Sequence, residues 1–373
     1  MGGCSNRPAC GLISSVSPAE RMAMENRVMT VGALDSFPRV RMAHLPTPLE
    51  EAANLGVDLG IDLWIKRDDC TGIGMGGNKV RQLEFYLGEA VSKGADTILI
   101  TGAVQSNFVR TAAAMAARLG MESHLQLEER VPHDTPLYRM SGNVLLDHLL
   151  GATLHSFPEG ENEAGADAKL EEIAADLRAK GRKPYVIHLG PGHAPLGALG
   201  YVDMARELLD QLAALRIDIG RIFVASGSAA THAGLLYGLR AFGSDIPVQG
   251  ICVRRDASLQ SSRVLARCGE IAELIGGQDI VTESDIRLDD TALAPGYGQM
   301  NGATRDAIHR AASREGMFLD PTYTAKVMAG LISFSERLSK TSAQEAEKPW
   351  LFIHTGGQPA LFAYGDQLTG DHK

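Results

Sequence analysis

The chain has neither a long apolar run nor a cluster of basic residues. No uninterrupted apolar stretch reaches the ~18 residues that a membrane span needs. Its 36 lysines and arginines are outnumbered by 45 aspartates and glutamates, which leaves a net charge of −9 at pH 7. This acidic balance argues against a nucleic acid as the main partner. We therefore expect a protein that neither spans a membrane nor binds nucleic acid.

Cysteines are few, and their spacing shows no pairing. The five cysteines, an odd number, are Cys4, Cys10, Cys70, Cys252 and Cys268. Such a pattern is typical of reduced thiols in the cytoplasm and not of a disulfide framework or a zinc site, so no metal is expected. Residues 1–35 lack the apolar core of a signal peptide and are predicted to be a disordered N-terminal extension.

Length and periodicity predict the architecture. A chain of 373 residues suggests two domains. From about residue 60 onward, apolar runs of strand length alternate with helical patterns, which predicts an α/β fold with mainly parallel sheets. The predicted strands are 61–66, 97–102, 123–127, 153–157, 185–189, 221–226, 248–253 and 350–354. The predicted helices are 107–119, 138–150, 162–180, 196–214, 231–242, 258–275, 301–315 and 324–339, besides one that begins at residue 78. Ligands of such sheets lie in the loops that lead from strands into helices.

The most informative loop follows the first predicted strand. Thr71 to Gly77 form a glycine-rich turn, and Lys79 lies at the start of the helix that begins at Asn78. Helix starts disfavour cations, and the same electrostatics lower the pKa of an amine. Lys79 is therefore a candidate nucleophile that can form a Schiff base. The alternative is a solvated surface lysine.

The glycines of this loop also match nucleotide-binding patterns, but incompletely. Residues 72–77 contain G-x-G-x-x-G, yet the next strand ends in Gly-Ala-Val-Gln at 102–105, without the acidic residue that binds a ribose. A Walker loop fails as well, because Asn78 separates Gly77 from the lysine and Val80 replaces the required Ser or Thr. Both nucleotide interpretations are disfavoured.

Two further loops could bind anions. Gln105, Ser106 and Asn107 offer donors at a helix start, where a carboxylate can bind. The small residues of 226–231 can wrap a phosphate, with help from the following helix terminus. A simple helix cap in the first case, and an ordinary Ser/Gly turn in the second, are the structural alternatives.

Three more segments carry candidate side chains. Tyr297 lies in a tight turn and Tyr323 at the entry to a helix, although either tyrosine can serve packing alone. Residues 354–357 (His-Thr-Gly-Gly) end the last predicted strand, in the same strand-to-helix position as the other loops.

Six segments, taken in order, resemble one family. They are GGNK (76–79), QSN (105–107), SGSAATHAG (226–234), PGYG (295–298), DPTYTAK (320–326) and HTGG (354–357). This set resembles the D-cysteine desulfhydrase and 1-aminocyclopropane-1-carboxylate (ACC) deaminase family over about residues 36–370. The resemblance implies a pyridoxal 5'-phosphate (PLP) enzyme of fold type II, the two-domain fold of tryptophan synthase β.

The resemblance also implies a role for each matching residue. Lys79 resembles the lysine that binds PLP covalently and later moves the α-proton, and Asn107 the residue that bonds the ring hydroxyl. The catalytic set implied is Lys79, Ser106, Tyr297 and Tyr323. The cofactor set is Lys79, Asn107, Ser226, Gly227, Ser228, Ala229, Ala230, Thr231, Thr324 and Thr355, and the substrate set is Gln105, Ser106, Asn107 and His193.

Fewer residues bear on the choice within the family. In deaminases of the family the corresponding pattern is DPxYEGK, and its glutamate faces the pyridine nitrogen and deepens the electron sink. This chain has Thr324 in place of that glutamate. Thr324 therefore resembles the desulfhydrase branch. Residues 67–72 and 141–147 resemble L-cysteate sulfo-lyases, and the loop 192–197 is closer to the deaminase version. His193 in that loop could contact an anionic distal group of the substrate, or it could be an exposed loop histidine.

The resemblance thus implies a lyase that eliminates the β-substituent of D-cysteine or a related β-substituted alanine such as L-cysteate. ACC deaminase is the alternative enzyme, and a non-catalytic sensor of PLP or an amino acid is the alternative of another class. The leaving group and the substrate's chirality remain open. We expect a large domain of 36–81 and 191–373, a small domain of 82–190, the cofactor between them, and a cytoplasmic homodimer.

Overall fold

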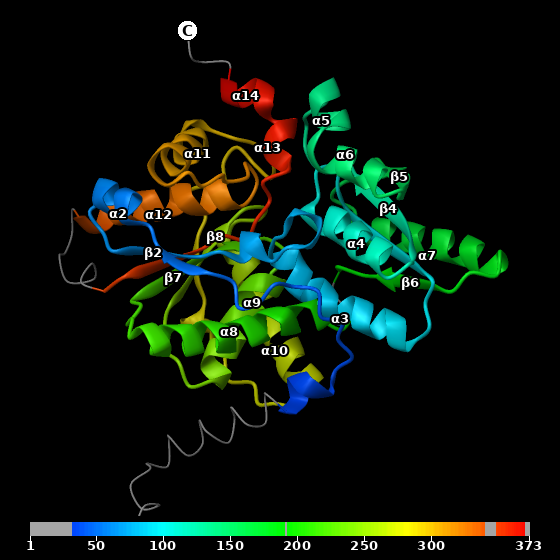
Figure 1. Ribbon diagram of the computed structural model, residues 1–373, viewed down its shortest axis with the longest axis horizontal. Helices are drawn as coiled ribbons and strands as arrows, with labels where there is room; N and C mark the ends of the chain where they lie inside the picture. Colours follow the sequence, from blue (N-terminus) through cyan, green and yellow to red (C-terminus); the bar gives the residue numbers. More distant parts are fainter. Residues whose placement is uncertain (1–31, 191, 340–347, 370–373) are drawn as a thin grey trace, which may run out of the picture.

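The computed structural model describes residues 32–190, 192–339 and 348–369, which form two sheets flanked by helices (Figure 1). Most of the predicted N-terminal extension lies outside the described residues. At its end, residues 32–36 form a helical turn, and Leu34 is buried in the larger core. This end of the predicted extension is therefore packed against the fold.

The larger sheet has the strand order β1-β2-β10-β7-β8-β9. Its strands are β1 (Leu49–Glu51), β2 (Leu63–Lys66), β7 (Arg221–Ser226), β8 (Val248–Cys252), β9 (Arg287–Asp289) and β10 (Trp350–Ile353). All neighbours are parallel except β1, which runs antiparallel to β2. The sequence pattern did not predict β1 and β9, because three residues are too few to show a period.

Helices cover both faces of the larger sheet. Along β7, Ile222 and Val224 pack into one core cluster while Phe223 packs into the other, as the two-residue period of a strand requires. The first cluster includes α8 (Leu196–Leu215), α9 (Ala230–Ala241) and α10 (Ala257–Ile275). The second includes α2 (Ala53–Leu59), α11 (Gly302–Glu315) and α12 (Thr324–Ser339). The predicted α/β fold with mainly parallel sheets is confirmed.

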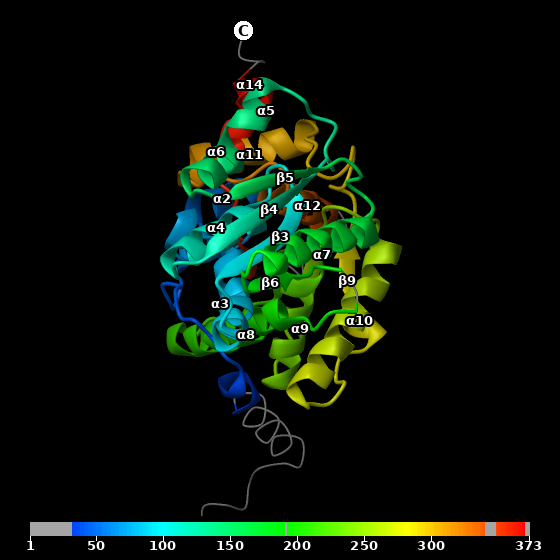
Figure 2. The same cartoon turned by 90° about the vertical axis from the view of Figure 1, so that its right-hand side faces the viewer.

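The smaller sheet has the strand order β5-β4-β3-β6, and all of its strands are parallel (Figure 2). Its strands are β3 (Thr97–Ala103), β4 (Glu122–Glu128), β5 (Thr153–Phe157) and β6 (Pro184–Ile187). Ile98 and Ile100 pack with α3 (Asn78–Ser92) and α4 (Asn107–Arg118), whereas Leu99 packs with α7 (Glu163–Ala179). These strands all come from the segment predicted as the small domain.

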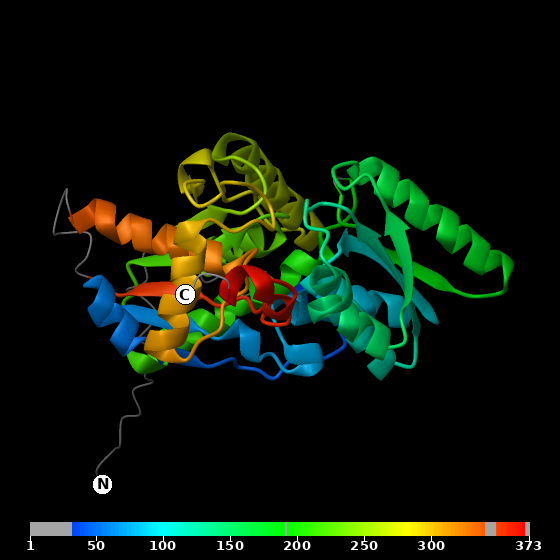
Figure 3. The ribbon, with the colours of Figure 1, turned by 90° about the horizontal axis from the view of Figure 1, so that it is seen from above.

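Helix α3 joins the two bodies, which Figure 3 shows side by side. Its Val80 and Leu83 belong to the smaller core, while Phe85 belongs to the larger one. Gly200 of α8 permits the close crossing, because a Cβ at this position would lie 2.3 Å from the carbonyl oxygen of Arg81. The helix that begins beside Lys79 is therefore held by both bodies.

The remaining elements are short. The predicted helix 138–150 is divided into α5 (Pro136–Met140) and α6 (Gly142–Leu149), because Ser141 is extended and Gly142 has a φ of +59°. Two 3-10 turns, η1 (Asp68–Cys70) and η2 (Ile73–Met75), follow β2, and η3 (Glu283–Asp285) precedes β9. Helices α13 (Ala360–Ala363) and α14 (Gly365–Thr369) follow β10. None of the described helices is long and apolar enough to cross a lipid bilayer.

Candidate active site

The glycine-rich turn after β2 brings Lys79 into a pocket. Gly76 has a φ of +68°, and a Cβ at this position would lie 2.0 Å from the carbonyl oxygen of Asp69, so this position requires glycine. The Thr71 hydroxyl spans the turn, since it donates to the Gly77 carbonyl and accepts from the Gly77 N–H, both at 2.8 Å. The N–H of Asn78 donates to the carbonyl of Thr355 at 2.9 Å, which ties the start of α3 to the end of β10.

Lys79 has no acidic partner among the described residues. Its Nζ lies 3.4 Å from Oε1 of Gln82 and 4.9 Å from the ring centroid of Phe108. Burial lowers the pKa of Lys79 to about 8. The predicted lowering of the pKa of this amine is confirmed in direction, and burial is its cause.

The loop between β7 and α9 forms one wall of the pocket. Residues 227–231 line it, and Ala229 adopts a left-handed conformation with a φ of +75°. The Thr231 Oγ1 accepts hydrogen bonds from Asn78 Nδ2 at 2.9 Å and from Gln82 Nε2 at 2.8 Å. Because both bonds use the oxygen as acceptor, the hydroxyl proton of Thr231 is left for a further partner.

Ser226 does not line this wall. Its hydroxyl is buried and accepts a hydrogen bond from Gln260 Nε2 at 2.9 Å, and it lies 3.0 Å from Nδ1 of His232. A direct contact of the Ser226 side chain with a phosphate does not fit this placement, and the hydroxyl instead ties the loop to α9 and α10.

Only two residues of the predicted Gln-Ser-Asn segment line the pocket, and they are Ser106 and Asn107. Ser106 caps α4, since its Oγ accepts from the N–H of Val109 at 3.3 Å. The side-chain oxygen Oδ1 of Asn107 accepts a hydrogen bond from Asn143 Nδ2 at 3.0 Å. The side-chain nitrogen Nδ2 of Asn107 has no hydrogen-bond partner in the described part of the chain. The predicted helix cap is therefore confirmed, and both residues also line the pocket.

Gln105 is turned away from the pocket. Its Nε2 donates to the carbonyls of Tyr138 at 2.7 Å and Ser141 at 3.0 Å, and its Oε1 accepts from the N–H of Asn143 at 2.8 Å. All polar atoms of this side chain are therefore occupied. The predicted contact of the Gln105 side chain with a substrate carboxylate does not fit this placement.

The two predicted tyrosines meet in the pocket. The hydroxyl oxygens of Tyr297 and Tyr323 lie 2.5 Å apart, and the rings form a T-shaped pair with centroids 6.0 Å apart. Burial raises the pKa of both phenols, so both are neutral at pH 7. One phenol donates to the other, which leaves one hydroxyl proton available to a ligand.

Thr324 and Thr355 are placed differently. Thr355 lines the pocket at the end of β10. Thr324 is buried and does not line the pocket; its hydroxyl donates to Asp320 Oδ1 at 2.8 Å and accepts from the Asp320 N–H at 2.7 Å. The predicted contact between Thr324 and the cofactor's ring nitrogen does not fit this placement of the hydroxyl.

Sequence reasoning missed three arginines in the pocket. Arg130, Arg254 and Arg267 line it, and neither Asp nor Glu is found among its described lining residues. Arg130 follows β4 and Arg254 follows β8, so the rule that ligands lie at the carboxyl ends of parallel strands could have indicated both. Each of the three is also paired with a glutamate outside the lining, namely Glu128, Glu163 and Glu270, so the pocket offers guanidinium donors whose charge is largely balanced. His193, predicted to contact the substrate, also lines the pocket and is exposed.

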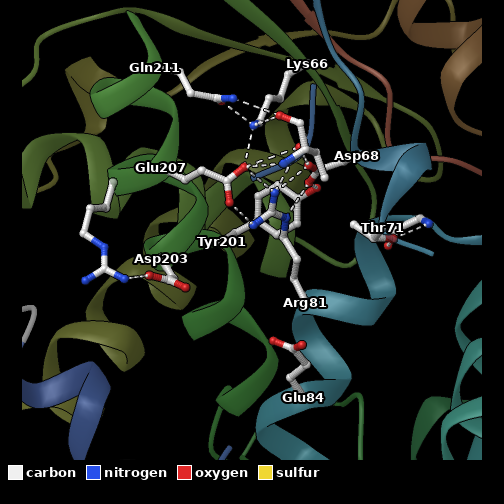
Figure 4. A network of polar contacts seen from close by, with 12 residues as sticks. Lys66, Asp68, Thr71, Arg81, Glu84, Tyr201, Asp203, Glu207 and Gln211 are labelled. Atoms are coloured by element: carbon white, nitrogen blue, oxygen red, sulfur yellow. Dashed lines mark hydrogen bonds and ion pairs between the residues drawn. The ribbon is translucent and has the colours of Figure 1, made fainter. Parts of the chain in front are cut away.

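A buried ionic network holds the first turn of α3, the turn that carries Lys79 (Figure 4). Arg81, two residues after Lys79, donates to Asp68 at 2.9 Å and to Glu207 at 2.9 Å. Lys66 Nζ donates to Glu207 Oε1 at 2.5 Å, and the Tyr201 hydroxyl donates to Asp68 at 2.6 Å. The two cations lower the pKa of Glu207 to about 2 against the opposing effect of its burial. The network thus fixes the first turn of α3 to β2 and α8.

Comparison with known proteins points to one family. Residues 40–356 match the family model described as pyridoxal-phosphate dependent enzyme. The chain is 42% identical over 337 residues to a D-cysteine desulfhydrase of Salmonella choleraesuis (strain SC-B67), covering 90% of this chain and 99% of the relative. A relative with the same description from Salmonella paratyphi C (strain RKS4594) has the same identity and coverage.

Solved structures are similar as well. A structure described as an ACC deaminase homologue matches with a TM-score of 0.80 and 37% identity, covering 92% of this chain and 98% of the other. A fungal L-serine ammonia-lyase from Rhizomucor miehei matches with a TM-score of 0.60 and 18% identity, covering 89% of this chain and 100% of the other. The second likeness concerns the fold alone.

Proposed function

The chain belongs to the family of pyridoxal-phosphate-dependent enzymes, and we propose that it is a carbon–sulfur lyase acting on D-cysteine. The overall reaction converts D-cysteine and water into pyruvate, ammonia and sulfide. The observation that carries this proposal is the weakly basic amine of Lys79, in a pocket that it shares with a hydrogen-bonded tyrosine pair. The likeness to the two desulfhydrases supports the substrate.

The polar groups of the pocket fit PLP. The Thr231 hydroxyl has a proton left to donate to the phosphate, and the backbone of residues 227–230 would wrap that phosphate at the start of α9. Nδ2 of Asn107, which has no hydrogen-bond partner among the described residues, would donate to the ring oxygen. When bound, PLP supplies the electron sink that stabilises negative charge at the substrate's α-carbon.

Lys79 has two tasks in this proposal. Its Nζ would hold the cofactor's aldehyde, and as a free amine it would take the α-proton of the substrate. A base must be neutral to accept a proton, and desolvation keeps a useful fraction of Lys79 neutral near pH 7. Gln82 and Phe108 hold the amine without adding a negative charge that would favour its protonated form.

The tyrosine pair and the start of α4 handle the substrate. The remaining hydroxyl proton of Tyr297 or Tyr323 is available to the departing sulfur, which gains negative charge as the β-substituent leaves. Ser106 and Asn107 bind the substrate carboxylate at the N-terminus of α4. Arg130, Arg254 and Arg267 are each paired with a glutamate, but they line the pocket and offer N–H donors to an anionic group of the ligand.

ACC deaminase is the second candidate function. The likeness to a solved ACC deaminase homologue favours it, while Thr324 disfavours it because this residue stands where the deaminase pattern has a carboxylate. Sulfite is the alternative leaving group, since a cysteate sulfonate would suit the three arginines. The product formed from each substrate separates these possibilities.

A substrate panel tests the proposed function. The purified enzyme with PLP is incubated with D- and L-cysteine, D- and L-cysteate, 3-chloro-D-alanine and ACC, and keto acid and released anion are measured. We expect pyruvate and sulfide in equal amounts from D-cysteine. Formation of 2-oxobutanoate from ACC without pyruvate from any cysteine would favour the deaminase, and binding without turnover would favour a sensor.

The Lys79→Ala variant is assayed with the same substrates. It removes the covalent link and the base, so the visible absorbance of bound cofactor is lost and turnover falls by at least about 10³-fold. Retained turnover in this variant would exclude the role proposed for Lys79.

We also propose that the enzyme is a cytoplasmic homodimer. The described cysteines Cys70, Cys252 and Cys268 are free thiols, as in a reducing compartment. Exposed apolar side chains gather on α5, α6 and α13, three helices that contact one another, and such a surface is typical of a protein interface. These side chains are Leu137, Met140, Leu145, Leu149 and Phe362.

Sedimentation velocity tests the homodimer. Leu149→Glu places a charge on this surface, where Leu149 is 73% exposed, and we expect it to convert dimer to monomer. Val57→Glu on the distant helix α2 is the control, because Val57 is 85% exposed but lies outside the surface. A wild-type monomer, or a dimer that persists in Leu149→Glu, would contradict the proposed interface.

A further inference from the structure

Asp167, His188 and His193 form a cluster at the rim of the pocket. Asp167 belongs to α7, His188 follows β6, and His193 lies in the loop before α8. One possible ligand atom from each residue lies within 4.8 Å of the other two. The reaction proposed above requires none of the three.

When His188 is neutral, no proton bridges its contact with Asp167. His188 Nε2 lies 3.1 Å from Oε1 of Glu171, and because a carboxylate can only accept, Nε2 carries the proton of this bond. In a neutral ring, Nδ1 is then a lone pair. This Nδ1 is buried without a hydrogen-bond partner, and it faces Asp167 Oδ1 at 3.4 Å. In this state His188 Nδ1 and Asp167 Oδ1 face each other, and each presents a lone pair and no hydrogen.

The spacing of these two atoms matches that of metal ligands. Zinc binds nitrogen and oxygen ligands at about 2.0–2.1 Å, so two ligands of a tetrahedral site lie about 3.3–3.4 Å apart. The bond from Glu171 to the far nitrogen of His188 is also the usual support of a metal-bound histidine, since it fixes the tautomer and the ring orientation.

His193 can supply the third ligand. Its ring is exposed and stacks on His188 with centroids 3.9 Å apart and planes 9° apart. No hydrogen bond holds the His193 side chain among the described residues, so the ring can turn about its side-chain torsions. In the stacked arrangement the two ring planes do not converge on one point, and coordination therefore requires this rotation.

We propose that Asp167, His188 and His193 bind a divalent transition-metal ion of the zinc type. Two imidazoles and one carboxylate suit Zn²⁺, Co²⁺ or Ni²⁺ better than Ca²⁺ or Mg²⁺, which prefer oxygen ligands. Three protein ligands leave the fourth tetrahedral position open. Because both histidines line the pocket, this position is accessible to water or to a small ligand in the pocket.

Calorimetric titration with Zn²⁺ tests the site. The full-length holoenzyme is freed of metal with a chelator, exchanged into chelator-free buffer and titrated beside Asp167→Asn, His193→Ala and His148→Ala. We expect wild type to bind one equivalent that both site variants bind at least about 10-fold more weakly. His148→Ala, which removes an exposed histidine of α6, should bind like wild type.

Two results would overturn the proposal. Absence of zinc binding to wild type would mean that a proton closes the contact between His188 and Asp167, as the pKa of His188, raised by Asp167, allows. Unchanged binding in both site variants would place the ion elsewhere. The readout is the heat of zinc binding, so failure of the proposed reaction would leave this test unaffected.

Discussion

At the scale of single residues, the most consequential property is the basicity of Lys79. With a pKa of about 8, about 9% of the amine is neutral at pH 7, against about 0.03% for a lysine with a pKa of 10.5. The neutral, nucleophilic fraction of the amine is therefore more than 100-fold higher than in an ordinary lysine, and burial is the cause of this increase. Neither a catalytic carboxylate nor a metal is needed to activate this lysine.

This basicity predicts the pH dependence of cofactor uptake. Because only the neutral amine attacks the aldehyde, the rate at which cofactor-free enzyme binds PLP covalently should rise with pH through a midpoint near 8. Stopped-flow measurement of the visible absorbance between pH 6.5 and 9.5 checks it. A rate that still rises tenfold per pH unit up to pH 9.5 would mean that Lys79 has the basicity of a solvated lysine.

At the scale of elements, the position of Lys79 depends on the first turn of α3. The turn is held by the Asn78 bond to β10, by the crossing with α8 at Gly200 and by the buried network around Arg81 (Figure 4). The network contains two cations and two anions, so its formal charges balance. Removing Arg81 leaves Lys66 and Glu207 paired with each other but leaves the buried carboxylate of Asp68 without its cationic partner.

Arg81→Met should therefore be strongly destabilising. It leaves Asp68 without its cationic partner, and we expect the free energy of unfolding to fall by about 3–5 kcal/mol. Urea unfolding of the cofactor-free protein measures this change. Lys169→Met, which breaks an exposed pair with Glu172, is the control and should leave the free energy of unfolding unchanged. An Arg81→Met protein as stable as wild type would refute the supporting role of the network.

At the scale of the whole molecule, an ionic latch connects the two bodies beside the pocket. Glu163, in the first turn of α7, accepts from Arg254 at 3.0 Å and from Arg255 at 2.7 Å, and lies 3.5 Å from Arg263. The arginines belong to the larger body, and Arg254 also lines the pocket. A change in the separation of the bodies would therefore change the electrostatics of the pocket.

Glu163→Gln should weaken this latch. Three arginines lose their shared counter-charge, so we expect the free energy of unfolding to fall by about 1–3 kcal/mol at pH 7 and low salt. The arginines lower the pKa of Glu163 against its desolvation, so this contribution is present above pH ~4.5 and is lost as the pH falls through the lowered pKa of the folded state. Urea unfolding at pH 7 and at acidic pH measures both effects.

Glu161→Gln is the matched control for the latch. Glu161 is mostly exposed and pairs only with Arg254 among the described residues. Its removal should change the free energy of unfolding by less than about 1 kcal/mol. Equal effects of the two variants would contradict a special role for Glu163.

Local patterns were sufficient for much of the architecture and for the central residue. Eight strands and most helices were predicted because their apolar periods are set by the chain itself. Lys79 stood out because a strand, a glycine turn and a helix start surround it in the sequence. The short strands β1 and β9 and the break at Ser141–Gly142 were missed, since they have too few residues to show a period.

Only the tertiary structure decided which way the polar side chains point. Gln105, Ser226 and Thr324 have the composition of ligand-binding residues, yet their polar atoms are used by Asn143, Gln260 and Asp320. Asn143 and Gln260 belong to helices that are distant in the sequence, and Asp320 lies four residues before Thr324 in the same segment. Hydrogen bonding depends on distances of about 3 Å, and sequence spacing does not determine these across packed elements. The sequence therefore determined where the pocket lies, and the packing of the two bodies determined which side chains face it.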